Sequence, residues 1–168
     1  RTIPKPVTAL AFLPQYTIKK QARGEVDLGG FAKGFLIDQL CTMLKDNYQA
    51  AYGQIIGGDD MRMWSTTDKV WEVPLLHPMH QSVMTTIHVK NAAVATSSRL
   101  QRTWQTTADH IHHILNGQTG QPAQTNIVQT TVICDDLTAG EVSAKLGFLT
   151  DEALLGPFSS YIVHEDGT

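Results

Sequence analysis

The sequence predicts an α+β fold in which helices pack on a mostly antiparallel sheet. Two helical patterns, at residues 31–48 and 137–149, enclose a long central stretch of strand patterns. The central strands are short and are separated by turn residues, which favours antiparallel pairs joined by hairpins. With 168 residues and 42% hydrophobic content, the chain is long enough for a sizeable core. No repeat or linker divides it, so we expect residues 1–168 to form a single domain.

The first helix is predicted from apolar periodicity. Leu36, Leu40 and Met43 or Leu44 recur at the spacing of one helical face, with Phe31 and Phe35 beside it. These residues mark one apolar face of the predicted helix. The second helix, at 137–149, follows a strong strand pattern.

The strand patterns occupy most of the remaining chain. Residues 50–56 resemble a buried strand, and the segments 61–64 and 70–76 are predicted to pair around a polar turn at 65–69. Further strand patterns, in chain order, lie at 7–13, 16–20, 83–89, 92–95, 127–134 and 161–163.

Composition excludes several classes of protein. The net charge is −3 and no long basic block occurs, which argues against a nucleic-acid surface. Cys41 and Cys134 lie inside predicted elements without metal-binding spacing, so we expect buried thiols rather than a bridge. No apolar run reaches membrane-spanning length, and no secretion signal is present. Because the chain begins at Arg1, a trimmed or split product is one expectation.

A glycine turn before the first helix is the principal candidate site. Gly29 and Gly30 separate an apolar-acidic run from the helix, and Lys33 lies in the first helical turn. Glycines permit positive φ and close approach of a ligand, while a helix start favours anions. The segment therefore predicts a phosphate-binding turn, or simply a strand-to-helix turn with a solvated lysine. Asp38 is either a solvated carboxylate or a partner for a ligand hydroxyl or Lys33.

Three further groups of residues could carry chemistry. Gly57 and Gly58, before two aspartates, would allow close backbone approach or form an ordinary hairpin turn. Glu141 and Lys145 are four apart, as in a surface ion pair, but could also face the same cavity as the glycine turn. Ser97, within the hydroxyl-rich segment 96–98, lacks a nucleophile-elbow motif, which favours hydrogen bonding to a ligand over nucleophilic attack.

Histidines suggest an alternative site. Most of the seven histidines lie between residues 77 and 113, and His110, His112 and His113 follow Asp109 directly. Imidazole and carboxylate groups suit zinc or iron, so a metal hydrolase is one hypothesis. In a strand, however, His110 and His112 would point to one face and His113 to the other.

The glycine turn and these segments together resemble the bacterial flavin transferases of the ApbE type. The residues that carry the resemblance form five segments in the family's order: residues 26–35 with Asp38, residues 56–59, residues 95–98, residues 113–122 and residues 139–147. The likeness begins near residue 16 and covers the C-terminal part of the family. It implies an ApbE-like fold whose N-terminal part is missing from this chain. The alternatives are that this part is a separate chain, has been cleaved away or is absent.

The resemblance implies a transferase that moves FMN from FAD to a threonine or serine hydroxyl of an acceptor flavoprotein, with release of AMP. It implies that Lys33 and His113 are catalytic, with His113 as the base. Flavin-binding positions would be Gly29, Gly30, Lys33, Gly34, Asp38, Gly57, Gly58, Ser97 and His113. Glu141 and the Ala32 carbonyl would hold Mg²⁺.

Two departures from the family pattern bear on activity. The closing helix carries Glu141 and Lys145, where the family typically has an aspartate and a threonine that serve magnesium. A charged lysine has donors but no acceptor, so Lys145 cannot be a metal ligand, although it could supply positive charge itself. The second departure is the missing half, which leaves a non-catalytic or FAD-hydrolysing flavin-binding relative as an alternative. Relatives of this type are lipid-anchored outside the cytoplasm or cytoplasmic.

Overall fold

The structure is a computed structural model that describes residues 10–21, 27–105, 110–117, 119–149 and 158–168. The elements, in chain order, are β1 (Leu10–Leu13), β2 (Thr17–Lys20), α1 (Ala32–Asp46), β3 (Tyr52–Gly57), β4 (Asp60–Ser65), β5 (Trp71–Leu76), β6 (Val83–Val89), β7 (Ala92–Ser98), β8 (Thr103–Gln105), β9 (His110–His112), β10 (Ile127–Cys134), α2 (Leu137–Leu146) and β11 (Ser159–His164). The fold is α+β with antiparallel sheets, as the sequence predicts.

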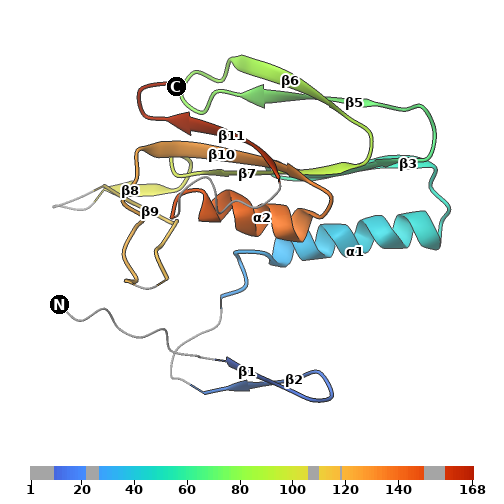
Figure 1. Cartoon of the computed structure of the whole chain (residues 1–168), viewed down its shortest axis with the longest axis horizontal. Helices are drawn as coiled ribbons and strands as arrows, with labels where there is room; N and C mark the ends of the chain where they lie inside the picture. Colours follow the sequence, from blue (N-terminus) through green and yellow to red (C-terminus); the bar gives the residue numbers. More distant parts are fainter. Residues whose placement is uncertain (1–9, 22–26, 106–109, 118, 150–157) are drawn as a thin grey trace.

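A five-stranded antiparallel sheet forms the centre of the molecule. Its strand order is β11-β10-β7-β4-β3, so strands that are distant in sequence become neighbours. Helices α1 and α2 lie on one face of this sheet, and the β5–β6 hairpin lies on the other (Figure 1). The three layers bring the ends of α1, β4, β7 and α2 close to one another.

Two hydrophobic clusters hold the layers together. One joins α1 and α2 to the sheet and contains Ile37, Ala93, Ala95, Val132, Cys134, Leu137 and Ala144. The other joins the β5–β6 hairpin to the opposite face and contains Met63, Val73, Leu75, Ile87 and Val94. Because β7 contributes to both clusters, it is buried on both faces, which agrees with its run of small apolar residues.

The predicted cysteine state is confirmed. Cys41 and Cys134 are both buried and free. Burial raises the pKa of each thiol, to about 11 for Cys134, because a thiolate loses its hydration in the apolar layer. Both residues therefore act as small core side chains.

The predicted pairing of segments 61–64 and 70–76 is wrong. β4 pairs with β3 and β7, whereas β5 pairs with β6 in a separate two-stranded sheet. The strand predicted as buried at 50–56 is instead β3 at the edge of the main sheet, where exposed and half-buried residues alternate. Alternative partners of this kind are decided by contacts across the fold, which local sequence does not encode.

The buried side of the first helix differs from the face that the spacing of Leu36, Leu40 and Met43 marks. In α1 the buried residues are Gly34, Ile37 and Cys41. Leu36 is 65% exposed, and Leu40 and Met43 are each 39% exposed. The helix is apolar on two sides. The sheet covers the side that carries Gly34, the glycine that lets α1 approach α2 closely.

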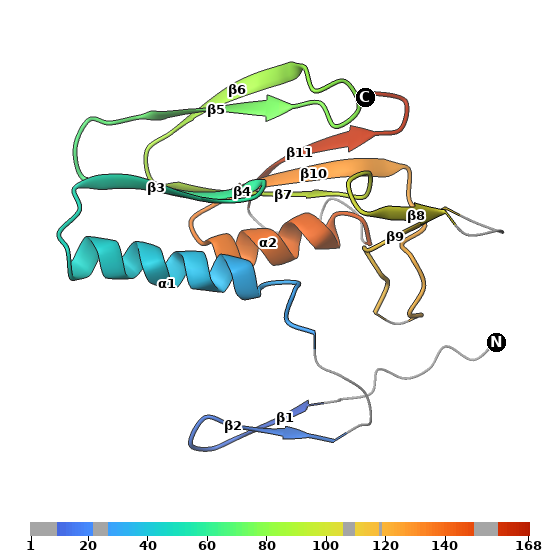
Figure 2. The ribbon, with the colours of Figure 1, turned by 180° about the vertical axis from the view of Figure 1, so that it is seen from behind.

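The β1–β2 hairpin lies apart from the helices and the sheet (Figure 2). Phe12, Tyr16 and Ile18 are all more than half exposed. The predicted strand at 7–13 starts, within the described residues, at Leu10, and the predicted turn at Gly24 falls outside them. In the described part of the chain, no helix is both long and apolar enough to cross a membrane.

Candidate functional site

A polar cavity of about 200 Å³ opens at the end of the molecule where α1, β4, β7 and α2 meet. Its lining residues come from segments spread along the whole chain, namely Gly29, Lys33, Gly58, Asp59, Asp60, Thr96, Ser97, Ser98, Gln101, Arg102, His113, Glu141 and Lys145. Lys33, His113 and Glu141 thus share one cavity. A second, more apolar cavity of about 160 Å³ adjoins it through Gly58, Asp59, Thr96, Ser98 and Gln101.

Lys33 reaches the cavity from the first turn of α1. Its Nζ lies 2.7 Å from Asp60 Oδ2, and its side chain remains 47% exposed. Asp60 itself is almost fully buried, and its Oδ1 accepts a hydrogen bond from the Thr96 N–H at 2.8 Å. The buried carboxylate thus fixes the lysine, whose exposed end faces the cavity. Asp60 is not among the residues predicted from the sequence, although its position directly after the Gly-Gly-Asp turn is a usable signal.

Glu141 is buried at the base of the cavity, 3% exposed, between α2 and α1. Its Oε2 accepts a hydrogen bond from the Gly34 N–H at 2.8 Å. Its Oε1 lies 3.3 Å from Lys145 Nζ and 3.9 Å from Lys33 Nζ. A buried carboxylate is stable only with such partners, because desolvation strongly disfavours the unpaired charge.

The start of α1 is used differently from the predicted phosphate-binding turn. The Ala32 N–H donates to the Leu28 carbonyl at 2.9 Å, and the Gly34 N–H donates to Glu141. Neither Gly29 nor Gly30 has a positive φ. Glu141 therefore already serves as the anion at this helix N-terminus, and positive charge toward a ligand comes from lysine side chains.

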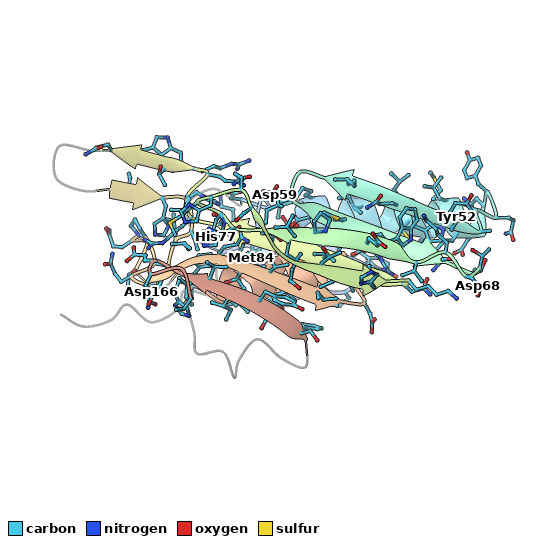
Figure 3. The ribbon with its side chains drawn as sticks, turned by 90° about the horizontal axis from the view of Figure 1, so that it is seen from above. Tyr52, Asp59, Asp68, His77, Met84 and Asp166 are labelled. Carbon is cyan, nitrogen blue, oxygen red and sulfur yellow. The ribbon has the colours of Figure 1, made fainter. Side chains whose placement is uncertain are left out.

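Three of the predicted glycines allow close packing or a turn. A Cβ at Gly34 would lie 2.8 Å from the Leu137 carbonyl oxygen, so glycine is needed where the two helices meet. A Cβ at Gly57 would lie 2.7 Å from Ile37 Cδ1, which places this residue under α1 rather than in the cavity lining. Gly58 adopts a φ of 68° in the β3–β4 turn, which favours glycine, and it lines both cavities. Figure 3 shows Asp59, the next residue in the chain, at the opposite end of β3 from Tyr52.

His113 lies directly after β9 and faces the cavity. Its Nδ1 is 3.3 Å from the Arg102 carbonyl oxygen. Because a carbonyl only accepts, this contact favours the tautomer with hydrogen on Nδ1 and a free lone pair on Nε2. Burial lowers the pKa of His113 below 6.5, since the charged ring is poorly solvated there. The side chain is therefore a neutral base near pH 7.

Arg102 and Ser97 line the side of the cavity that is formed by the end of β7 and the loop after it. Ser97 is 8% exposed and lies in β7, at the register position opposite Thr130. Arg102 adds a third cation to the lining and was not singled out from the sequence, because an arginine in a polar loop gives no distinctive signal. Ser97 offers a hydroxyl and Arg102 a planar donor group to a polar ligand.

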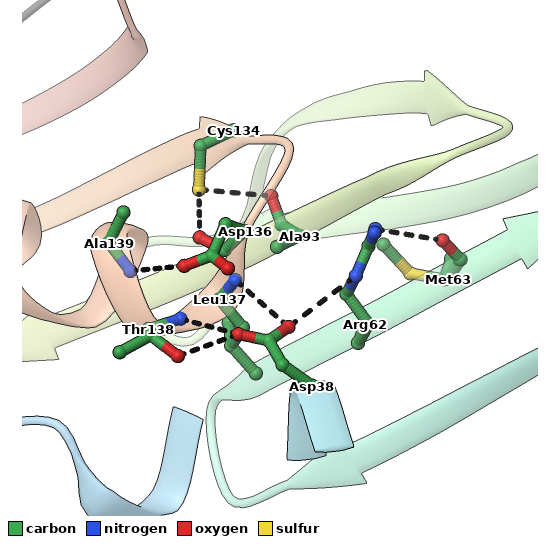
Figure 4. A network of polar contacts seen from close by, with 9 residues as sticks. All are labelled: Asp38, Arg62, Met63, Ala93, Cys134, Asp136, Leu137, Thr138 and Ala139. Atoms are coloured by element: carbon green, nitrogen blue, oxygen red, sulfur yellow. Dashed lines mark hydrogen bonds and ion pairs between the residues drawn. The ribbon is translucent and has the colours of Figure 1, made fainter. Parts of the chain in front are cut away.

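Asp38 lies outside the cavity lining and organises the second helix (Figure 4). Its Oδ1 accepts from the Leu137 N–H at 3.1 Å, and its Oδ2 accepts from the Thr138 N–H at 2.9 Å. Arg62 Nε lies 3.5 Å from Oδ1. Asp38 thus joins Asp136, the N-cap residue of α2, in satisfying N–H groups that have no partner inside the helix.

The described part of the histidine cluster does not converge. His112 is buried, with Nε2 3.2 Å from the Ala123 carbonyl oxygen, while His113 faces the cavity. Asp109 and the side chain of His110 fall outside the described residues. Among the described residues, no three His, Cys, Asp or Glu side chains are grouped to hold a metal ion.

The implied magnesium site fits these residues poorly. Both Glu141 oxygens already have donors, and Lys145, one helical turn later, places an ammonium group at Oε1. Ala32 is not among the residues that line the cavity. A divalent cation needs oxygen acceptors in this place, and an ammonium group offers none.

A polar cavity lined by both cations and carboxylates, between two helices and the end of an antiparallel sheet, defines an α+β protein with a charged site at the sheet end. The family model of the ApbE family matches residues 5–156, and the chain belongs to this family. The structure superposes on the crystal structure of the ApbE protein from Thermotoga maritima with a TM-score of 0.85 and 26% identity, over 95% of this chain and 55% of that one. Against the apo flavinyl transferase ApbE from Pseudomonas stutzeri, the TM-score is 0.77 at 17% identity.

Curated relatives carry the name FAD:protein FMN transferase. The protein from Treponema pallidum is 27% identical over 153 residues, which cover 82% of this chain and 42% of the relative. The Escherichia coli K12 protein is 25% identical and is covered over 40% of its length. The chain therefore spans about two fifths of the length of these relatives.

Proposed function

We propose that the chain is a flavin transferase that moves FMN from FAD to a threonine or serine hydroxyl of an acceptor protein and releases AMP. The observation that carries the proposal is the shared cavity of Lys33, His113 and Glu141, which gathers residues up to 108 positions apart. The relatives of this chain are named FAD:protein FMN transferase. Such phosphoryl-type chemistry depends chiefly on positioning and on stabilising charge.

Each of the lining residues named below has a separate role in the proposed reaction. The acceptor oxygen attacks the phosphorus of the FMN moiety, and the bond from this phosphorus to the AMP phosphate oxygen breaks. His113 Nε2 takes the proton of the hydroxyl, as a neutral histidine can. Lys33 and Arg102 stabilise the charge that develops on the phosphate oxygens. Ser97 donates a hydrogen bond to the ligand, and Gly58 lets the backbone approach it.

A second candidate is a flavin-binding relative that hydrolyses FAD or performs no chemistry. One observation favours it: the Lys145 ammonium group lies beside the Glu141 carboxylate, where a metal ligand is expected from the family pattern.

Incubation with FAD and an acceptor peptide separates these candidates. The peptide would carry a threonine from a protein that a relative flavinylates, and the products would be followed by mass spectrometry and by AMP release. Transfer gives a peptide heavier by FMN together with AMP, whereas hydrolysis gives free FMN and AMP. His113→Ala should abolish transfer, and His88→Ala, at an exposed residue outside the cavity, should not. Absence of both flavinylated peptide and AMP removes the transferase proposal.

A further inference from the structure

The Lys145 ammonium group lies where a metal ion would have to approach Glu141. We propose that the cavity binds the diphosphate of its ligand without a divalent cation, because Lys145 supplies the positive charge at Glu141. The inference rests on the proposed function for the identity of the ligand, but diphosphate binding can be tested without it.

The geometry directs Lys145 toward both Glu141 and the cavity. Its Nζ lies 3.2 Å from the Glu141 carbonyl oxygen and 3.3 Å from Oε1 of the same residue. An ammonium group has three N–H donors, so two contacts to Glu141 leave one for a ligand. The side chain is 30% exposed and lines the cavity, so this donor is accessible to a phosphate oxygen.

The charges of the described lining residues show why this lysine matters. Three cations, Lys33, Arg102 and Lys145, face three carboxylates, Asp59, Asp60 and Glu141. A neutral residue at position 145 would leave an excess of negative charge, which would repel a diphosphate in a half-buried site. A divalent cation would correct that excess, but so does the lysine that the chain already carries.

Lys145 also disfavours a metal ion directly. Two ammonium groups, at 3.3 and 3.9 Å, already neighbour Glu141 Oε1. A cation bound to this oxygen would lie close to both of them, and like charges at such separations repel strongly where water is partly excluded. Glu141 is therefore a positioning residue that aligns two lysines and the start of α1.

The test measures binding of ADP and of FAD by calorimetry, in excess EDTA and in excess MgCl₂. Lys145→Thr removes the charge, Lys145→Arg retains it, and Lys90→Thr alters an exposed lysine outside the cavity as a matched control. Circular dichroism checks that every variant is folded.

We expect the unaltered chain and the Lys90 variant to bind ADP equally well in both buffers, within about twofold. Lys145→Thr should lose about tenfold in EDTA and regain affinity with Mg²⁺, as for the loss of one charge-assisted hydrogen bond. Lys145→Arg should remain independent of the metal.

The outcomes distinguish this inference from the proposed function. The role of Lys145 is overturned if the unaltered chain binds ADP only with Mg²⁺, or if Lys145→Thr binds ADP with unchanged affinity. In either case the flavin transferase still stands if FAD binds. Metal-free binding of ADP that weakens in Lys145→Thr, without binding of FAD, supports the role of Lys145 and overturns the flavin transferase. If neither ADP nor FAD binds in either buffer, both the role of Lys145 and the flavin transferase are overturned.

Discussion

At the scale of single residues, burial changes how much an ion pair contributes to stability. Glu141 and Lys145 have the spacing of a helical surface pair, which contributes only about 0.2–0.5 kcal/mol. In the structure the glutamate is 3% exposed and also contacts Lys33 and the Gly34 N–H. Removal of one partner from such a buried group costs about 3–5 kcal/mol, because the remaining charge is uncompensated. The same two residues thus contribute much more to the stability of the fold in this cavity than they would on a surface.

His112 gives a prediction for the pH dependence of stability. Burial lowers its pKa in the folded chain below the ordinary histidine value of 6.5. Between the two values the unfolded chain binds more protons, so the free energy of unfolding rises with pH there and falls as the pH drops below about 6.5. Equilibrium urea unfolding at a series of pH values from neutral to acidic measures this slope.

His112→Gln should flatten the slope, because glutamine does not titrate and can still donate to the Ala123 carbonyl. His88→Gln is the matched control, since its side chain is 61% exposed. An unchanged slope in the His112 variant, or an equal flattening in both variants, would contradict the assignment.

At the scale of elements, the contact between α1 and α2 determines the geometry of the cavity. Gly34 allows the helices to touch, Asp38 holds the first N–H groups of α2, and Glu141 holds an N–H group of α1. Each helix therefore satisfies donors at the start of the other. This reciprocal arrangement fixes Lys33 and Glu141 relative to each other without a ligand.

Gly34→Ala tests this contact. Alanine favours a helix over glycine by about 1 kcal/mol, so an open helical position would become more stable. Here the new Cβ would meet the backbone oxygen of Leu137 at 2.8 Å, and overpacking of this kind costs about 1–3 kcal/mol. We expect a net loss of about 1 kcal/mol in urea unfolding and weaker ligand binding.

Gly117→Ala serves as the control, because a Cβ there has nothing within 4 Å and its φ is not positive. It should leave the free energy of unfolding within about 0.5 kcal/mol. If Gly34→Ala proves as stable as this control, the close helix contact is not required.

At the scale of the whole molecule, one side of α1 and the β1–β2 hairpin present apolar side chains to solvent. Phe35, Leu36 and Phe12 are all more than 45% exposed. α1 is thus apolar on two sides, of which the described elements cover one. The relatives are more than twice as long as the matched segment, so their additional chain has no counterpart among the elements described for this one.

A pair of substitutions on α1 tests which side of the helix the core covers. Ile37→Ala should reduce the free energy of unfolding by about 2–4 kcal/mol, because Ile37 is 8% exposed in the cluster beneath the helices. Leu36→Ala, one position earlier on the exposed side, should change it by no more than about 0.5 kcal/mol. Chemical unfolding of this chain alone measures both values, and an equal loss in the two variants would show that the outer side is covered too.

Local sequence determined much of the fold of this protein. The helices at 31–48 and 137–149 and the strands around residues 83–89 and 127–134 follow from periodicity, which is a property of neighbouring residues. The α+β class follows from their order. The residues that line the cavity were predicted in part by resemblance, since Lys33, Gly58 and His113 lie in recognisable segments.

Only the tertiary structure decided which apolar side of α1 is buried, which strands pair, and where Glu141 points. Periodicity reports that Leu36 and Ile37 are both apolar, but the choice between their faces depends on the small residues of α1 that fit against α2. Likewise Asp60 joins the cavity because β4 pairs with β7, a strand distant in sequence. Arg102 joins it from the loop between β7 and β8. Burial and charge pairing depend on residues that are close in space but distant in sequence, and these residues become neighbours only once the chain has folded.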